Sequence, residues 1–171
     1  PSYMALKVTD MNTYNILFLC THNSARSILA EALASTQTNG RLVGFSAGSL
    51  PGKDVNPIAR ELAIQMGYPA KRIFSKNWSE YALVGAPRMD FIITLCDSAA
   101  GETCPFWPGN PAKIHWGFPD PSKVQGSYED KRSAFIKILS ELRKRIQLLA
   151  GDPLNDRALQ AALKSIDSVD E

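Results

Sequence analysis

The sequence predicts an α/β protein in which helices cover both faces of a central, four-stranded parallel sheet. Short apolar runs alternate along the chain with segments whose apolar residues recur at helical spacing, as in strands joined by crossover helices. With 171 residues, 44% of them hydrophobic and 21% charged, the chain has the size and composition of one globular domain. We therefore expect a three-layer α/β sandwich.

Four segments have the character of strands in such a sheet. The run NILFL at 15–19 and the centre of MDFIITLC at 89–96 are apolar throughout, as expected for strands that are covered on both faces. RLVGFSAGS at 41–49 and KIHWGF at 113–118 are the other two predicted strands. Ligands bind beyond the carboxyl ends of parallel strands, so the residues that follow these segments are candidates for a site.

Three helices are predicted to connect and follow the strands. The segment RSILAEALAST at 26–36 places its apolar residues on one face. A second helix begins at Pro57, with Asn56 as its N-cap, and ends near Gly67. A third helix opens at Ser127, where a capping sequence precedes a long apolar stripe.

We expect the folded domain to cover residues 15–150. Residues 1–14 lack periodicity and are expected to be an N-terminal extension, which is either partly of cloning origin or an irregular N-terminus. Residues 151–171 are treated as a C-terminal extension, with a short helix predicted from Pro153 to about Ile166.

Charge and composition exclude several classes of function. The net charge is +2 and the basic residues are scattered, so we expect no nucleic acid and no membrane as partner. The apolar runs are too short to span a bilayer, and no secretory signal pattern is present, so we expect a cytoplasmic protein. Three cysteines in a reducing compartment are more often reactive or buried than part of a disulfide framework. Without CxxC or HxxxH spacing, no metal site is expected.

The stretch LCTHNSARS at 19–27 joins the first predicted strand to the first helix. Its backbone amides from Thr21 to Arg26 can point inward as an anion-binding nest at the positive end of the helix dipole. That field lowers the pKa of the Cys20 thiol from about 8.5, and Arg26 offers two parallel donors to a tetrahedral oxyanion. An arginine six residues after a cysteine has about one chance in ten of arising by composition alone. The position between a buried strand and an amphipathic helix is what predicts a nucleophile.

The other residues of this loop have supporting roles. Ser27 can hydrogen-bond the Cys20 thiolate, and Asn23 can hold the shape of the loop. Ser24 and Ala25 are small enough for the backbone to curl closely around an anion. For His22 two interpretations remain, a side chain that points to solvent and a catalytic one.

A candidate acid follows the fourth predicted strand in HWGFPDPS at 115–122. Pro119 and Pro121 restrict the backbone on both sides of Asp120. A carboxyl held above an oxyanion nest can donate a proton to a leaving oxygen, provided that its pKa is raised there. The alternative is an ordinary Asp-Pro turn.

Two further cysteines lie in TLCDSAAGETCPFWPG at 94–109. Hydrolysis of a phosphocysteine needs neither, whereas reduction of an oxyanion needs a second thiol with which to form a disulfide. If the stretch between Cys96 and Cys104 were helical, their α-carbons would lie about 12 Å apart, beyond the limit of about 7 Å for a disulfide. A bond between them requires unwinding or a loop, which Gly101 and Pro105 favour. Two buried, unreactive cysteines are the alternative.

Together these motifs resemble the low-molecular-weight protein tyrosine phosphatase superfamily, whose fold is flavodoxin-like, and within it the arsenate reductases. The resemblance covers about residues 15–150 and is carried by LCTHNSARS, SAGS at 46–49, TLC…CP at 94–105 and HWGFPDP at 115–121.

The resemblance implies a thiol relay. Cys20 attacks arsenate held by the loop and Arg26, with Asp120 assisting the loss of water. Cys96 then attacks Cys20 and releases arsenite, and Cys104 moves the disulfide to Cys96–Cys104 for reduction by thioredoxin or a similar donor. No bound cofactor is implied, and phosphate and sulfate would be weak analogues of arsenate.

The chain departs from the family pattern in two places near the thiols. Ala25 occupies a position where a second loop cysteine is common, which removes nothing that the relay needs. Seven residues separate Cys96 from Cys104, one more than in some thioredoxin-coupled members. Glutathione with glutaredoxin is therefore the competing donor.

A third departure concerns the potassium site of some relatives. Asn23, Glu31 and Ser46 match that site, whereas Lys76 replaces the remaining acidic ligand. The Lys76 ammonium can stand in for the ion, so we expect a vestigial cation site and potassium independence.

Two other functions compete with arsenate reduction. A tyrosine phosphatase would use Cys20, Arg26 and Asp120 alone, but Ser122 stands where a tyrosine commonly follows the Asp-Pro pair in that branch. A non-catalytic oxyanion-binding or redox-sensing module is the remote alternative. A weak phosphatase side activity is compatible with a reductase.

Overall fold

The structure, a computed structural model, describes residues 13–101 and 105–151. The predicted N-terminal extension lies almost wholly outside these ranges, as do Cys104 and the helix predicted from Pro153. None of the helices in the described part of the chain is long and apolar enough to cross a bilayer.

Four parallel strands form the central sheet in the order β2-β1-β3-β4, which confirms the predicted fold class. The strands are β1 (Tyr14–Cys20), β2 (Leu42–Gly48), β3 (Phe91–Thr94) and β4 (Ala112–His115). The last two are shorter than predicted. The residues that follow them keep backbone hydrogen bonds, such as Phe118 N–H to the Leu95 carbonyl at 3.1 Å, but leave the regular ladder. These irregular ends form part of the site.

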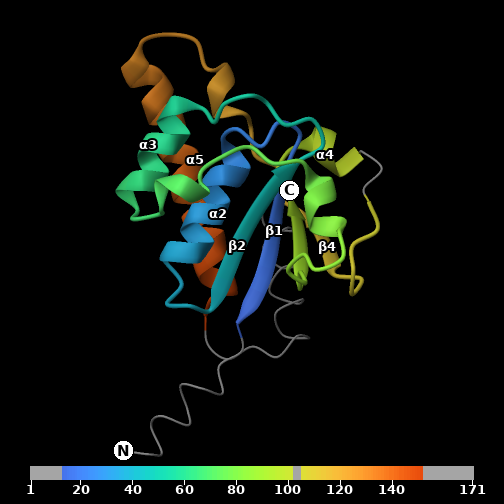
Figure 1. The fold of residues 1–171 in the computed structure, drawn as a ribbon. Helices are drawn as coiled ribbons and strands as arrows, with labels where there is room; N and C mark the ends of the chain where they lie inside the picture. The colour runs from blue at the N-terminus through green and yellow to red at the C-terminus, as the bar shows by residue number, and fades with distance from the viewer. Residues whose placement is uncertain (1–12, 102–104, 152–171) are drawn as a thin grey trace, which may run out of the picture.

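Helices cover the two sides of the sheet unequally (Figure 1). One side carries α2 (Arg26–Thr36), α3 (Pro57–Gln65) and α5 (Tyr128–Leu149), which pack on one another. The other side carries the 3-10 turn η2 (Trp78–Ala82) and Trp107. The short helix α4 (Asp97–Gly101) follows β3, and its Ala99 is buried in the same cluster as residues of α2, α3 and α5. Two further 3-10 turns are η1 (Ala70–Arg72) and η3 (Pro121–Lys123). The helices start as predicted, with Asn56 capping α3 and Ser127 forming a capping box with Asp130.

Strand β1 is the centre of the core because both of its faces are covered. Ile16 and Phe18 pack into the cluster beneath α2, α3 and α5, while Leu17 and Leu19 pack into the second cluster with Trp107. All four are fully buried. Burial on alternating faces explains why the strand is apolar at every position. It also fixes Cys20, the last residue of β1, at the carboxyl edge of the sheet.

Candidate active site

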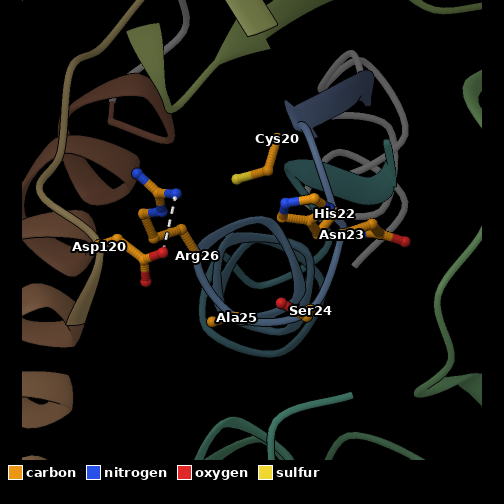
Figure 2. A pocket seen from close by; sticks show the side chains of 7 residues that line it. All are labelled: Cys20, His22, Asn23, Ser24, Ala25, Arg26 and Asp120. Carbon is orange, nitrogen blue, oxygen red and sulfur yellow. Dashed lines mark ion pairs between the residues drawn. The ribbon is translucent and has the colours of Figure 1, made fainter. Parts of the chain in front are cut away.

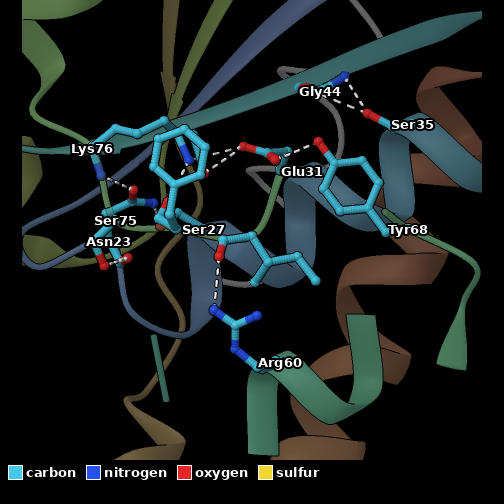
Figure 3. A network of polar contacts seen from close by, with 12 residues as sticks. Asn23, Ser27, Glu31, Ser35, Gly44, Arg60, Tyr68, Ser75 and Lys76 are labelled. Carbon is cyan, nitrogen blue, oxygen red and sulfur yellow. Dashed lines mark hydrogen bonds and ion pairs between the residues drawn. The ribbon is translucent and has the colours of Figure 1, made fainter. Parts of the chain in front are cut away.

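The loop between β1 and α2 curls tightly around its own backbone amides. Asn23 adopts a left-handed conformation, with φ of 51°, which asparagine tolerates better than most residues. Its buried side-chain amide donates to Ser27 Oγ at 2.8 Å and accepts from the Lys76 backbone N–H at 2.8 Å (Figure 3). Ala25, the N-cap of α2, provides no side-chain acceptor for the first turn of that helix. Those amides are thus placed to bind an anion.

This loop lines a small pocket together with the predicted acid. The lining residues are Cys20, His22, Asn23, Ser24, Ala25, Arg26 and Asp120. In Figure 2 the sulfur of Cys20 points toward the guanidinium of Arg26, with Asp120 on the far side of that guanidinium. Arg26 Nη2 lies 3.7 Å from Asp120 Oδ2, and Arg26 Nη1 donates to the Phe118 carbonyl at 2.7 Å. The geometry therefore assembles a thiol, a guanidinium and a carboxyl around one cavity.

His22 connects the loop to the segment that follows β2. Its Nδ1 lies 3.0 Å from the Leu50 carbonyl oxygen, so the ring N–H donates to that carbonyl. The ring is exposed. This hydrogen bond ties the loop after β1 to the segment after β2. It therefore gives His22 a structural role, which differs from both predicted interpretations, the solvent-facing side chain and the catalytic one.

Cys96 follows β3 and lies against Cys20. Both side chains are buried, and each thiol is the largest influence on the pKa of the other. Cys96 Sγ also lies 3.6 Å from Thr21 Oγ1 and accepts from the Ala99 backbone N–H at 3.4 Å. Ser27 provides a further hydrogen bond to Cys20. The side chain of Thr21, predicted to act only through its amide, thus contacts the second thiol.

The two thiols affect each other's pKa in opposite directions. Hydrogen bonding with Cys96 and burial raise the pKa of Cys20 well above its ordinary value, although Arg26 and Ser27 act in the opposite direction. The hydrogen bond from Cys20 lowers the pKa of Cys96 to about 5 against the effect of burial, with help from Thr21 and Ala99. Arg26 and Ser27 act on the Cys20 pKa in the predicted direction, but Cys96 and burial outweigh them, so the predicted lowering of that pKa is not found in this arrangement. The reason is that Cys96 is a second thiol next to Cys20 that can carry the negative charge in its place.

Asp120 is an ionised carboxylate in this arrangement. Burial tends to raise its pKa, but hydrogen bonds from Ser122 and the charges of Arg26 and Lys123 prevail and lower it. Ser122 donates to Asp120 Oδ1 from its backbone N–H at 2.9 Å and from its hydroxyl at 2.7 Å. To donate a proton, Asp120 would need a raised pKa, and in this arrangement its pKa is lowered instead.

Behind the loop lies a buried polar network around Glu31 (Figure 3). The Glu31 carboxylate accepts from Ser46 Oγ at 2.7 Å and from the Tyr68 hydroxyl, and it lies 3.5 Å from Lys76 Nζ. Lys76 Nζ also donates to the Phe74 carbonyl at 2.6 Å. Burial lowers the pKa of Lys76, an effect that Glu31 partly offsets. The network joins the residues predicted as a vestigial cation site and adds Tyr68, which no sequence motif indicated.

No group of three or more side chains that could hold a metal ion occurs in residues 13–101 and 105–151. Cys104 lies outside these ranges, so its role remains a prediction. The stretch after Cys96 begins as a helix, α4, which is the case in which the two cysteines would be far apart.

The chain belongs to the low molecular weight phosphotyrosine protein phosphatase family, which it matches over residues 15–164. Among curated relatives, an arsenate reductase from Halalkalibacterium halodurans is 36% identical over 140 residues, which are 82% of this chain and 97% of the relative. An arsenate reductase from Bacillus subtilis is 33% identical over 135 residues, covering 79% of this chain and 94% of the relative. These matches confirm the resemblance.

Solved structures agree with the family assignment. The crystal structure of an arsenate reductase from Archaeoglobus fulgidus matches 80% of this chain and 99% of its own, with a TM-score of 0.60 and 26% identity. A thioredoxin-dependent arsenate reductase from Corynebacterium glutamicum matches 84% of this chain and 67% of its own, with a TM-score of 0.51 and 26% identity.

Proposed function

We propose that this protein is an arsenate reductase, which reduces arsenate to arsenite with its own thiols as the source of electrons. The observation that carries the proposal is a second buried thiol, Cys96, that interacts with Cys20 beside an oxyanion pocket. A phosphatase needs one thiol there, whereas a reductase needs a second thiol within reach of the first. The arsenate reductases among the relatives support the same conclusion.

In the first step, Cys20 attacks arsenic while the loop amides and Arg26 hold the arsenate oxygens. A sulfur–arsenic bond forms and one oxygen leaves as water. The Cys20 proton passes along the existing hydrogen bond to Cys96 as Cys20 becomes the nucleophile. Asp120 assists the departure, because an arsenate anion between it and Arg26 raises the pKa of the carboxyl and allows it to donate a proton.

In the second step, Cys96 releases its proton to solvent and attacks the Cys20 sulfur. A disulfide forms, the sulfur–arsenic bond breaks, and its electron pair stays on arsenic, which leaves as arsenite. The two thiols have then supplied the two electrons of the reduction. The Thr21 hydroxyl and the Ala99 N–H lie beside Cys96 and stabilise the attacking thiolate.

Cys104 completes the relay by attacking Cys96, which frees Cys20 and leaves a Cys96–Cys104 disulfide. Because α4 begins directly after Cys96, the segment has to unwind for the two cysteines to meet. An external thiol donor then reduces this disulfide. Thioredoxin is favoured, as in the thioredoxin-dependent neighbour, and glutathione with glutaredoxin is the alternative. No bound cofactor takes part.

The deciding experiment couples arsenate reduction to NADPH oxidation. One reaction contains thioredoxin and its reductase, and the other contains glutathione, glutaredoxin and glutathione reductase. Sustained oxidation that depends on arsenate identifies a reductase and its donor. No turnover in either reaction, together with fast hydrolysis of an aryl phosphate, would refute the proposal in favour of a phosphatase.

The pocket is lined for a tetrahedral oxyanion, to which it offers its loop amides and Arg26. Among the described residues that line it, none is phenylalanine, tyrosine or tryptophan, and His22 has the one aromatic ring. Within this pocket the phenyl ring of phosphotyrosine would therefore have only the His22 ring to pack on. Slow hydrolysis of a small aryl phosphate remains compatible with a reductase, because the loop binds phosphate and arsenate through the same contacts.

An Asp120→Asn variant is expected to lose hydrolysis of an aryl phosphate by about 100-fold or more, since general acid catalysis contributes that much to loss of a poor leaving group. Arsenate reduction should fall by less than about tenfold, because arsenic exchanges its oxygen ligands with less need for an acid. Steady-state rates of both reactions on one preparation test this. An equal loss in both reactions would contradict the assignment.

Arsenate reduction is expected to proceed at the same rate in potassium chloride and in choline chloride of equal concentration. Lys76 already supplies a positive charge 3.5 Å from Glu31, with its side chain buried, so the network has no need of an ion. Thermal unfolding measured in both salts is the control, and the midpoints should coincide. A potassium-specific gain in rate or midpoint would show that Lys76 does not replace the ion.

A further inference from the structure

We propose that Arg145 of α5 is a positioning residue for Arg26, acting through the aromatic segment that follows β4. Arg145 is buried, and its guanidinium lies over two rings, 4.5 Å from the ring centre of Phe118 and 5.6 Å from that of Trp116. Phe118 in turn accepts a hydrogen bond from Arg26. The inference rests on the proposed oxyanion pocket at Cys20 and not on the thiol relay.

Two kinds of contact hold the segment between β4 and η3: the Arg145 guanidinium over its two rings, and backbone hydrogen bonds to β3 and the residue that follows it. Trp116 N–H donates to the Thr94 carbonyl at 2.8 Å, and Phe118 N–H donates to the Leu95 carbonyl at 3.1 Å. Both rings face α5, because the Arg145 guanidinium lies over each of them. A planar cation stacked on both rings fixes their positions, and with them the direction of the Phe118 carbonyl.

The direction of that carbonyl determines how Arg26 faces the pocket. The donors of a guanidinium lie in one rigid plane, so a 2.7 Å bond from Nη1 to the Phe118 carbonyl leaves Nε and Nη2 for other partners. Two such parallel donors are what bidentate binding of an oxyanion requires. A displaced Phe118 would leave the loop amides intact but turn Arg26 away from the arsenate or phosphate.

A guanidinium is an unusual choice for a site where an apolar side chain would fill the same space. Burial of a charged group is unfavourable unless other contacts compensate, and an apolar replacement is often neutral or stabilising. Lysine would keep the charge but lose the planar stacking surface. The contacts of the Arg145 guanidinium with the Phe118 and Trp116 rings are what link this position on α5 to the segment.

The test compares Arg145→Gln and Arg145→Lys with Ile138→Ala. Ile138 is buried on the same face of α5, about 10 Å along the helix from Arg145, and serves as a control for loss of stability. Binding of inorganic phosphate is measured by calorimetry below the unfolding transition of every variant, and urea unfolding measures stability. Kinetic constants for arsenate are measured on the same proteins.

We expect Arg145→Gln to weaken phosphate binding and raise the arsenate KM by about tenfold, with kcat changed by less than about threefold. Arg145→Lys should recover part of the affinity, and Ile138→Ala should bind phosphate like the wild type despite its lower stability. Wild-type affinity in either folded Arg145 variant, or an equal loss in Ile138→Ala, overturns the inference. If Arg145→Gln does not fold, Arg145→Lys alone decides. A wild-type protein that binds no phosphate refutes the oxyanion pocket itself.

Discussion

A Cys96→Ser variant is expected to release no arsenite while it hydrolyses an aryl phosphate at least as fast as the wild type. A serine hydroxyl forms no disulfide with Cys20, so the sulfur–arsenic adduct has no route to reduction. Hydrolysis through Cys20, Arg26 and Asp120 does not involve Cys96. Arsenite formation should fall by at least about 1000-fold, measured in single turnover with excess protein.

Cys104→Ser is the matched control for this prediction. It keeps the Cys20–Cys96 pair, so it should release one arsenite for each protein molecule and then stop with those two cysteines joined. Mass spectrometry of the trapped disulfide identifies the pair. If Cys96→Ser lost both activities to the same extent, or if Cys104→Ser released no arsenite, the order of the relay would be wrong.

The same Cys96→Ser variant should change the pH dependence of hydrolysis in a known direction. Hydrogen bonding with Cys96 is the largest influence that raises the pKa of Cys20. Without the second thiol that influence disappears, while Arg26 and Ser27 still lower the pKa. The Cys20 thiolate then persists to lower pH, so the acidic limb of the rate profile should move to lower pH. A shift to higher pH would contradict the assigned coupling.

The elements that hold the nucleophile could be predicted because local patterns determine them. A central strand buried on both faces is apolar at every position, as β1 is from Ile16 to Leu19. The capping side chain of Asn56 and the capping box at Ser127 lie within three residues of the amides that they bind. Such short-range patterns are visible in the sequence, and the structure confirms them.

The charge distribution in the site could not be predicted, because contacts between distant residues determine it. Cys20 and Cys96 are 76 positions apart, and they meet because β1 and β3 are neighbours in the sheet. Sequence periodicity does not give the strand order. For Asp120 a local signal was present, since a serine two residues after an aspartate often donates to its carboxylate. The hydrogen bonds from Ser122 that lower the Asp120 pKa follow from this pattern.

Cys20→Ser is expected to abolish both arsenate reduction and aryl phosphate hydrolysis, by at least about 10,000-fold each. Both reactions begin with attack by the Cys20 sulfur, and a serine hydroxyl in this place has no base positioned to activate it. Phosphate binding should survive within about threefold, because the loop amides and Arg26 remain. Calorimetric titration with phosphate therefore separates loss of the nucleophile from loss of the fold.

A Cys20→Ala variant, which leaves no hydrogen-bond donor at this position, should move the titration of Cys96 in the direction opposite to that of Cys20 in Cys96→Ser. The hydrogen bond from Cys20 is the largest influence that lowers the Cys96 pKa to about 5. When this donor is lost, burial, which raises the Cys96 pKa, is opposed by fewer contacts. The ultraviolet absorbance of the Cys96 thiolate should therefore appear only at higher pH. Opposite shifts in the two variants are the signature of two thiols that share one proton. An unchanged Cys96 titration in Cys20→Ala, or residual turnover by Cys20→Ser, would refute a paired nucleophile.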